Sequence, residues 1–405
     1  MPVNNLILNE KPLFALKKSA SVLSRLWHHL FFTVNILAII WLLACKGASL
    51  YNPAGRPSVI SLLSFTTTFA YIVNIFFVIY WLFSRRKLRA LYSLIVLVLL
   101  WGMLRPLMGF NYFGDNDLSA ETGDLKVMTW NVHMFDLGAW TNDETAKAKI
   151  IKLINDEDPD VLCLEEFFRD TKQNGMPYTD IIRSLGYPYV AFSKQYTMPK
   201  RRLTIHALKG AKIDVGNAIF SKFPLKNIQS YELGIPNYTM LSADAQIDSS
   251  HTVSLNVVHL TSVHFGSKEM EYISEVKEEG IDKQNTGRSK SLLKKLRYAF
   301  SQRAVLANNI DSLKRFMDNP IIICGDFNDV PSSYVYEKVK GSLSDPFAQK
   351  GIGLGRSYRN IFPTLRIDYI LYDDNALKVI GYGRRIEPLS DHFPVVANFV
   401  FKGEK

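Results

Sequence analysis

Polar side chains suited to hydrolysis follow apolar, strand-like runs at separate points of this chain. The segments that hold them are "WNVH", "CLEEF", "VVHL", "CGDFNDVP", "RIDYIL" and "SDHFPV". Each supplies a carboxylate, an amide or an imidazole, and the residues are Asn131, Glu165, Glu166, His259, Asp326, Asn328, Asp368, Asp391 and His392. Such groups bind hard cations through oxygen, or accept and donate protons.

The hydrolysis of phosphate esters needs this mixture of groups. The negative oxygens of a phosphate ester repel a nucleophile, so catalysis requires a divalent cation, a base for the attacking water and donors to the phosphoryl oxygens. Mg²⁺ prefers a few oxygen ligands and keeps several waters. A single strand-terminal Asp or Asn is more often a turn former, so the prediction depends on the whole ordered set.

The order and contexts of these segments resemble the endonuclease/exonuclease/phosphatase superfamily over about residues 126 to 401. That superfamily includes pancreatic-type deoxyribonucleases, exonuclease III-like repair enzymes, inositol-polyphosphate 5-phosphatases and neutral sphingomyelinases. The resemblance implies an α/β fold, a four-layered sandwich of two packed mixed β-sheets flanked by helices. It also implies a hydrolase that acts on phosphate ester bonds with Mg²⁺ or Mn²⁺.

Metal-binding roles follow from the resemblance. Asn131 and Glu166 are expected to hold the cation, and Asp391 is expected to be a ligand of a second metal site. Glu166 is preferred over Glu165 because the family's "LQE" pattern places its metal-binding acid second. Glu165 is then expected to be a neighbour that faces solvent.

Catalytic roles are implied in the same way. Asp326 is expected to orient or deprotonate the attacking water, and Asn328 to donate to the phosphoryl group. His392 should contact the scissile phosphate or transfer a proton, oriented by Asp368 through a carboxylate–imidazole hydrogen bond. His259 is expected to be a phosphate contact or general acid, although it could instead be a core histidine with satisfied hydrogen bonds.

The substrate stays open at the level of sequence. Repair endonucleases of this type usually have an acid two residues after the motif Asn, whereas this chain has His133, which argues against specificity for abasic sites. The first hypothesis is a nuclease or another phosphodiesterase. Phospholipid or sphingolipid headgroups are a second substrate class. A catalytically silent binding module is the alternative of another kind, and the intact polar set argues against it.

The amino-terminal segment contains three apolar stretches without Asp, Glu, Lys or Arg, at residues 30–45, 59–83 and 90–104. A helix needs ~20 residues to span the hydrocarbon, which the middle stretch meets alone and the outer two meet with their flanking residues. The first stretch could also be a cleaved signal peptide, but the other two would still anchor the chain. The sequence therefore predicts a membrane anchor of about three transmembrane helices.

The charge distribution supports an anchor more than a nucleic-acid-binding surface. The formal net charge is +10, and residues 1–110 hold 11 of the 48 Lys and Arg but one of the 38 acids, so the remaining residues are balanced. The basic segments before the first stretch and in "SRRKLR" should be cytoplasmic. Three spans would then place the following domain outside the cytoplasm.

The chain is accordingly divided into a membrane anchor (1–110), a linker (111–124) and a catalytic domain (125–405).

Strands are expected in "LKVMTWNVH", "DVLCLEEF", "VGNAIFSKFPL", "LSADAQID", "TVSLNVVHL", "IIICGDFND", "RIDYILYD", "KVIGYGRRI" and "PVVANFVF". Alternation in "TVSLNVVHL" predicts one buried face, and "IIIC" predicts burial of both. Helices are expected at about 143–156, capped by Asn142, and 296–317. Polar insertions lie at 193–214 and 268–297. Cys45, Cys163 and Cys324 are interpreted as small buried hydrophobic residues.

Overall fold

The computed structural model describes residues 11–119, 123–137, 143, 145–170, 178–198, 212–263, 286–359 and 365–403. The chain forms two compact units. One contains Met1–Lys46 and Thr66–Trp101, and the other contains Gly47–Phe65 and Gly102–Lys405. The connection between the first two apolar stretches thus belongs to the second unit, together with all of the strands.

Apolar helices make up the first unit. They are α1 (Lys11–Leu50), α2 (Thr67–Leu82), the 3-10 helix η2 (Lys87–Arg89) and α3 (Ala90–Leu99). Two segments, Leu26–Leu50 and Ile60–Leu82, are long and apolar enough to cross a membrane. The third predicted span is interrupted at Leu100, between α3 and α4 (Trp101–Leu104), and neither helix alone has the length of a span.

A buried polar network joins helices α1, α2 and α3 of the first unit. The Asn35 side chain donates to the Ser93 hydroxyl at 2.6 Å and accepts from the Trp81 indole at 2.9 Å. The Ser93 hydroxyl donates to the Asn74 amide oxygen at 3.1 Å, and the Asn74 amide donates to the Ala38 carbonyl at 3.0 Å. Because polar groups in an apolar surrounding are costly without partners, this network favours one arrangement of α1, α2 and α3.

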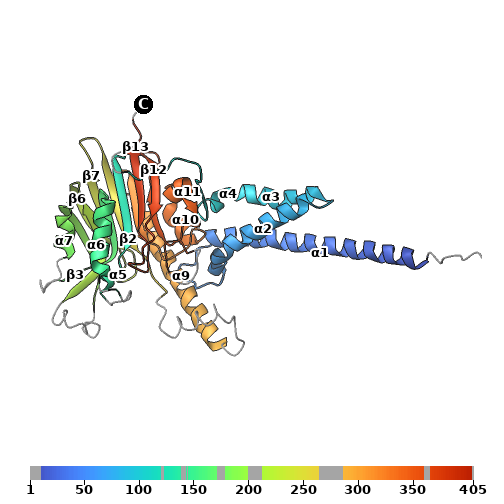
Figure 1. Ribbon diagram of the computed structural model, residues 1–405. Coiled ribbons are helices and arrows are strands. Elements are labelled where there is room, and N and C mark those ends of the chain that lie inside the picture. Colours follow the sequence, from blue (N-terminus) through green and yellow to red (C-terminus); the bar gives the residue numbers. More distant parts are fainter. Residues whose placement is uncertain are drawn as a thin grey trace, which may run out of the picture. The chain divides into compact units, whose positions relative to one another are not determined.

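The second unit is built on two mixed sheets (Figure 1). The six-stranded sheet has the order β12-β13-β2-β3-β5-β4. Its strands are β2 (Leu125–Asn131), β3 (Val161–Asp170), β4 (Tyr189–Thr197), β5 (Ile213–Ser221), β12 (Leu377–Arg384) and β13 (Val395–Phe401). In this sheet β2 and β3 are parallel, and the other neighbours are antiparallel.

The five-stranded sheet has the order β11-β9-β8-β7-β6. Its strands are β6 (Leu225–Glu232), β7 (Thr239–Gln246), β8 (Thr252–His259), β9 (Ile321–Asp326) and β11 (Asp368–Tyr372). Here β8 and β9 are the parallel pair. Every strand predicted from sequence forms, whereas β4 and β6 were not predicted.

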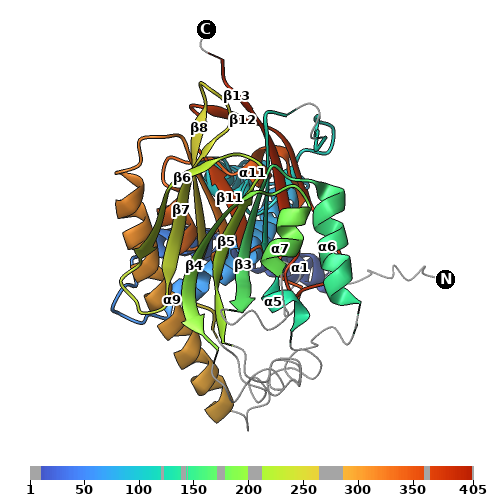
Figure 2. The same ribbon diagram turned by 90° about the vertical axis from the view of Figure 1, so that its left-hand side faces the viewer.

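The two sheets pack face to face, and helices cover their outer faces (Figure 2). The layer between the sheets includes Leu255 of β8 and Ala397 of β13, both fully buried. Helices α6 (Ala146–Glu157) and α7 (Tyr178–Ser184) pack on the six-stranded sheet. Helices α9 (Thr286–Lys314) and α10 (Tyr334–Lys340) pack on the five-stranded sheet. The predicted four-layered sandwich is confirmed.

Helix α6 confirms the prediction for residues 143–156. Its apolar residues Ile150 and Ile154 are four apart and fully buried, which places them on one face of the helix. Asp158 ends the helix in a left-handed conformation (φ 43°). The predicted cap Asn142 lies outside the described residues, as do large parts of the two polar insertions, residues 199–211 and 268–285.

Burial of β8 differs from its prediction. Alternation predicted one buried face, but residues 253–258 are all buried, because α9 covers the face that does not meet the other sheet. Asn256 is fully buried there and donates to the carbonyls of Ser254 and Ile322. The predicted burial of "IIIC" in β9 is confirmed. Cys45, Cys163 and Cys324 are also buried as predicted.

Short elements complete the second unit. They are the 3-10 helix η1 (Ile60–Thr66), α5 (His133–Asp136), α11 (Pro346–Lys350), β1 (Gly109–Phe110) and β10 (Ile352–Gly353). Strand β1 pairs with β10, and Asn116 bonds both backbone groups of Tyr382 in β12. Much of the predicted linker therefore packs against the catalytic domain.

Candidate active site

Strand direction brings the predicted residues to one edge of the sandwich. Asn131 ends β2 opposite Glu165 of the parallel strand β3, and His259 ends β8 opposite Asp326 at the end of the parallel strand β9. Asp368 begins the antiparallel strand β11, also opposite Asp326. Carboxyl ends of parallel strands share an edge with the amino ends of antiparallel neighbours, so these side chains converge.

Asp326 lies at the centre of this cluster and is fully buried. Its Oδ1 accepts from the Asn328 backbone at 2.8 Å, and its Oδ2 accepts from the Asn328 and Asn131 side chains at 3.0 and 3.3 Å. The Nε2 atoms of His392 and His259 lie 3.6 and 3.7 Å from Oδ2. One carboxylate oxygen therefore faces two amides and two imidazoles.

His392 and Asp368 form a pair beneath the cluster. The His392 Nδ1 lies 3.0 Å from both carboxylate oxygens of Asp368, and both residues are buried. Trp130 donates its indole N–H to the His392 carbonyl at 3.0 Å. The ring is thus held so that its Nε2 points to Asp326.

Burial and neighbouring charges shift the pKa values of Asp326 and His392. Burial raises the pKa of Asp326 to about 6, against the attraction of His392. Burial alone would lower the pKa of His392, but the carboxylates of Asp368 and Asp326 raise it well above its usual value. The His392 imidazole therefore keeps its proton beside the Asp326 carboxylate, whose pKa is about 6.

Glu166 and His259 form the rim of the site, where their side chains are partly exposed. Their closest atoms, Glu166 Oε1 and His259 Nε2, are 3.7 Å apart, and Asn131 Nδ2 lies 3.4 Å from the same oxygen. The β3 ladder shifts register between Leu164 and Phe167, and Glu166 adopts φ 50°. This bulge turns Glu166 toward the site.

The neighbouring Glu165 lies in the interior. Glu165 is fully buried and accepts from the Thr129 hydroxyl at 2.8 Å. The prediction that Glu165 faces solvent is therefore wrong, because alternation along β3 places Glu165 on the face of Val161 and Cys163, which packs against the other sheet. Burial raises its pKa well above the usual value.

Asp391 lies at the rim beside His133, with 3.3 Å between Asp391 Oδ1 and His133 Nδ1. His133 begins the segment α5, whose four residues all have positive φ, from 42° to 54°. A left-handed backbone costs roughly 1–2 kcal/mol per residue, so this turn depends on the surrounding structure. The backbone N–H of His133 donates to Asn131 Oδ1 at 3.1 Å, and this bond fixes the Asn131 side chain.

Comparison with known families agrees with this geometry. Residues 128–392 match the Endonuclease/Exonuclease/phosphatase family. The chain belongs to this family. It is therefore a hydrolase that acts on phosphoester bonds, and its family match spans the residues assembled above. Residues 28–107 match a second family, described as a domain of unknown function (DUF8431).

Relatives of this endonuclease/exonuclease/phosphatase protein include an exoribonuclease subunit. It is 30% identical over 128 residues to the CCR4-Not complex 3'-5'-exoribonuclease subunit Ccr4 of Phaeosphaeria nodorum, a match covering 22% of this chain and 21% of that protein. It is 24% identical to Nocturnin of Mus musculus, over 71% of this chain and 68% of that one. The human Nocturnin catalytic domain with bound sulfate is a similar solved structure, with 22% identity, a TM-score of 0.48, and coverage of 69% of this chain and 94% of that chain.

Two donor sets at the site could hold a divalent cation. Among the described residues, ligand atoms of Asp326, Asp368 and His392 lie within 4.8 Å of one another. However, both oxygens of Asp368 already face the His392 imidazole. Glu166 instead offers a carboxylate at the partly exposed rim. The buried Asn131 beside it offers an amide oxygen that also accepts from the His133 backbone N–H, and such oxygens are the kind of ligands Mg²⁺ prefers. The side chains of this family member therefore fit a hard divalent cation.

Three residues around the site were not predicted to have a role there. The Ser390 hydroxyl donates to the Asn131 carbonyl at 2.8 Å and accepts from the His392 amide. The Tyr358 ring meets the His392 ring edge-on, with centroids 4.9 Å apart. Ser390 precedes "DH" in sequence and could have been included with that motif, whereas nothing in the sequence around Tyr358 indicates its position. His133 was noted only as a departure from the family pattern.

Two polar residues of the scaffold, Arg303 and Ser221, have structural partners. Arg303 is fully buried and binds Asp329 at 3.1 Å and the Thr261 carbonyl at 3.2 Å. The Ser221 hydroxyl accepts from the Phe223 amide at 2.9 Å. The two Arg303 contacts tie the segments after β8 and β9 to α9.

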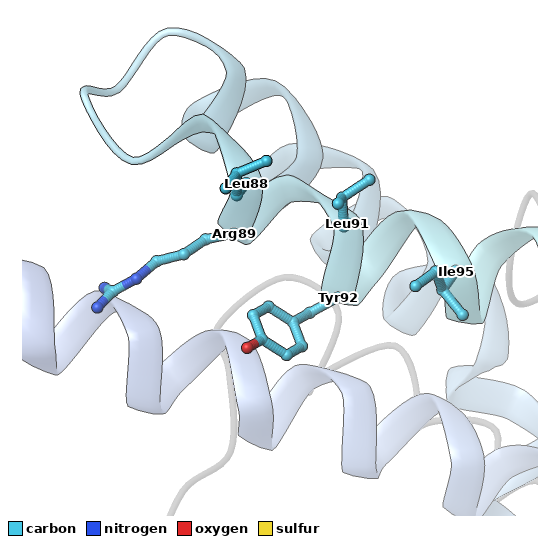
Figure 3. A pocket seen from close by; sticks show the side chains of 5 residues that line it. All are labelled: Leu88, Arg89, Leu91, Tyr92 and Ile95. Carbon is cyan, nitrogen blue, oxygen red and sulfur yellow. The ribbon is translucent and has the colours of Figure 1, made fainter.

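A pocket of about 380 Å³ lies in the first compact unit and has a different chemistry (Figure 3). It is lined by Leu88, Arg89, Leu91, Tyr92 and Ile95. Arg89 points toward α1, donates to the His28 carbonyl at 3.1 Å, and stacks 4.4 Å from the centre of the Phe32 ring. These lining residues include no carboxylate and no cluster of polar groups like the one around Asp326, so the pocket is not a hydrolytic site.

Proposed function

We propose that this chain is a membrane-anchored phosphodiesterase that requires Mg²⁺ or Mn²⁺ and cleaves nucleic acid. The observation that supports this function is the buried Asp326 carboxylate, surrounded by Asn131, Asn328, His259 and His392. A carboxylate with a raised pKa, beside hydrogen-bond donors, can both accept a proton from water and remain next to a phosphate.

Each side chain has a role in this proposal. Asn131 and Glu166 hold the cation, which supplies positive charge to the phosphoryl oxygens when it is bound. Asp326 orients the attacking water and accepts its proton. Asn328 and His259 donate to the phosphoryl group.

His392 contacts the same phosphate, and Asp368 keeps the imidazole in one orientation and stabilises its charged form. Asp391 is proposed as a ligand of a second cation. It lies at the rim rather than in the central cluster, and its carboxylate faces His133. The hydrogen bond and charge of His133 oppose the effect of burial and lower the pKa of Asp391, so this carboxylate is ionised at neutral pH.

A nucleic acid substrate is supported by the relative whose name states an exoribonuclease activity. A lipid phosphodiester is the second candidate, because an anchored enzyme would meet such substrates at the bilayer surface. Both have a phosphate diester at the reacting centre, so the residues at the site do not separate them.

The anchor would cross the membrane three times. The connection between the first two candidate spans packs with the catalytic unit: Arg297 donates to the Pro57 carbonyl at 2.8 Å, and Ser332 donates to the Ser64 carbonyl at 2.7 Å. If α1 and α2 both cross the membrane, the chain leaves α2 on the side opposite to that connection. The domain lies on the same side as the connection, so the chain must cross a third time. A helical stretch from Lys87 to Leu104 would extend roughly 27 Å, against a hydrocarbon core of ~30 Å.

This topology places the catalytic domain outside the cytoplasm. The amino terminus and the connection "SRRKLR" would lie on the opposite side from the domain, and both are basic. Basic segments are retained on the cytoplasmic side.

The substitution Asp326→Asn tests the reaction. It keeps the size of the side chain but removes the proton acceptor, so kcat should fall about 10²–10⁴-fold while the melting temperature changes little. Purified full-length protein would be assayed with Mg²⁺ on single-stranded RNA, DNA and phospholipid vesicles. Asp248→Asn, at an exposed turn, is the matched control and should retain full activity.

The substrate panel also decides between the candidates. Cleavage of RNA or DNA but not phospholipid supports the nuclease. Hydrolysis of phospholipid alone would replace it by a lipid phosphodiesterase. Full activity of the Asp326→Asn variant would remove Asp326 from the mechanism, and no hydrolysis of any ester together with no cation binding would favour a silent binding module.

A further inference from the structure

Helix α9 has a basic half that the catalytic site does not use. Residues 286–297 read "TGRSKSLLKKLR", with five Lys or Arg, and the first acid in α9 is Asp311. Residues 287–298 contain no fully buried position, whereas Ala299 and Phe300, which follow, are buried. Both ribbon views show this half extending beyond the ends of the strands (Figure 1, Figure 2).

One exposed stripe of this half-helix combines cations with an aromatic ring. Lys290, Lys294 and Tyr298 are exposed and four residues apart, so they lie on one face. Tyr298 is 58% exposed, unusual for a side chain with so much apolar surface. Tyrosine with lysine is the combination found where a protein meets the membrane–water interface.

The base of this half-helix is bound to the segment that connects the two candidate spans. Arg297 donates to the Pro57 carbonyl, and the Phe300 ring contacts the Phe65 ring with centroids 5.5 Å apart. Pro57 comes three residues before Ile60, where the second candidate span begins. Three residues extend at most about 11 Å, so Arg297 must lie close to the membrane surface if that span crosses.

From Arg297, the rest of the basic half is within reach of the same surface. At ~1.5 Å per residue, Lys290 lies only about 10 Å along the helix from Arg297. Added to the distance of at most about 11 Å between Pro57 and Ile60, this places Lys290 within about 21 Å of the start of the span. That is two to three Debye lengths of ~8 Å at physiological salt, so attraction by anionic headgroups requires the half-helix to lie along the surface. Each Lys or Arg near an anionic membrane contributes measurably to this attraction.

We propose that the stripe formed by Lys290, Lys294 and Tyr298 binds anionic phospholipid headgroups and holds α9 against the bilayer. This inference rests on the proposed membrane anchor and is independent of the substrate. Nucleic acid is the competing ligand for a basic helix, but the bond from Arg297 to the span connection favours the membrane.

The test uses the full-length chain in lipid nanodiscs. A fluorophore on Ser291→Cys, an exposed position in the half-helix, reports contact with a quencher attached to lipid headgroups. The native cysteines are buried and should not react. We expect strong quenching in discs that contain phosphatidylglycerol, weaker quenching in phosphatidylcholine alone, and loss of the difference in ~1 M salt, where the Debye length is about 3 Å.

The variant K290Q/K294Q should reduce quenching in phosphatidylglycerol discs to the phosphatidylcholine level. The matched control K149Q/K152Q removes two exposed lysines from α6 and should leave quenching unchanged. Quenching that is indifferent to lipid charge or to K290Q/K294Q would overturn the inference. The inference would also be overturned if the only effect of K290Q/K294Q were a loss of oligonucleotide binding, measured in phosphatidylcholine discs.

Failure of the anchor is recognised separately. Alkaline extraction would release the chain from membranes if the apolar helices do not span them, which overturns the anchor and this inference together. A chain that resists extraction but shows no charge-dependent quenching overturns the inference alone.

Discussion

At the scale of single residues, adjacent glutamates in "CLEEF" have opposite environments. Glu165 is fully buried with a raised pKa, and Glu166 lies at the partly exposed rim. The sequence predicted which of the two faces the site, from the family pattern, but not the burial of the other. Alternation along β3 buries Glu165 with Val161 and Cys163. The one-residue bulge that turns Glu166 to the site depends on how β3 pairs with β5.

Glu165→Gln should change the pH dependence of stability without weakening cation binding. An ordinary Glu titrates near pH 4.3 in the unfolded chain, whereas buried Glu165 keeps its proton to higher pH. The free energy of unfolding that Glu165 contributes is therefore full below about pH 4.3 and is lost as pH rises toward the folded pKa. Between pH 5 and 8 the variant should show a flatter loss of stability, measured by chemical denaturation.

Glu166→Gln is the complementary change and should weaken Mg²⁺ or Mn²⁺ binding, measured by calorimetry, with little effect on stability. Asn131 and His259 would keep an amide partner in place of the carboxylate. If Glu165→Gln weakened cation binding and Glu166→Gln did not, the assignment of the metal ligand would be reversed.

Asp368→Asn tests whether Asp368 acts through His392. The amide keeps the shape but cannot hold Nδ1–H in the same way, and it removes a charge that raises the imidazole pKa. We expect kcat to fall about 10²–10⁴-fold with little change in KM. A larger change in KM than in kcat would indicate that Asp368 binds substrate instead.

At the scale of elements, strand β9 depends on Gly325. Its φ is +133°, and an added Cβ would stand 1.9 Å from the Val258 carbonyl of β8. Gly325→Ala should therefore cost roughly 3 kcal/mol in stability, from strain and overpacking, and should displace the neighbouring Asp326. Gly353→Ala also has positive φ but meets nothing within 4 Å, so it should cost only about 1 kcal/mol. Thermal unfolding and kcat of both variants provide the comparison.

The strands were predictable where their side chains are apolar on both faces, as in β9, and less so at the edges. Strand β6 has an exposed pattern, with residues 226–230 all exposed, and was not predicted because its stability comes from pairing with β7. Strand β4 begins in "YVAF" and continues into a polar stretch that was interpreted as an insertion. Pairing with β5 overrides that polar composition.

In the first compact unit, Asn74→Ala should loosen the three-helix arrangement. Asn74 donates to the Ala38 carbonyl of α1 and accepts from Ser93 of α3, and such interhelical bonds in membranes contribute about 0.6–1.7 kcal/mol. The melting temperature in nanodiscs should fall, while kcat on a soluble substrate stays unchanged. Ile75→Ala removes an exposed neighbour and serves as control; equal losses for the two variants would contradict a role for the polar network.

At the scale of the whole molecule, hydropathy predicted an anchor but not how its parts are shared between the units. The connection between the first two apolar stretches folds with the catalytic unit. Neither composition nor hydrophobic periodicity indicates this, because the packing depends on single contacts such as that of Ser332 with Ser64. Likewise, Met134 and Phe135 lie in a left-handed turn that bulky residues disfavour. Long-range contacts, rather than local preference, determine both features.

Those contacts make the sidedness of the protein testable. Because the domain binds the connection between α1 and α2, the segment around Arg86 should lie on the other side of the membrane. We expect a membrane-impermeant maleimide to label Asn375→Cys in right-side-out vesicles and Arg86→Cys only in inverted ones, since both positions are exposed and the native cysteines are buried. Labelling of both positions from the same side would mean that the stretch from Lys87 to Leu104 does not cross, and the domain would then share the side of the basic segments.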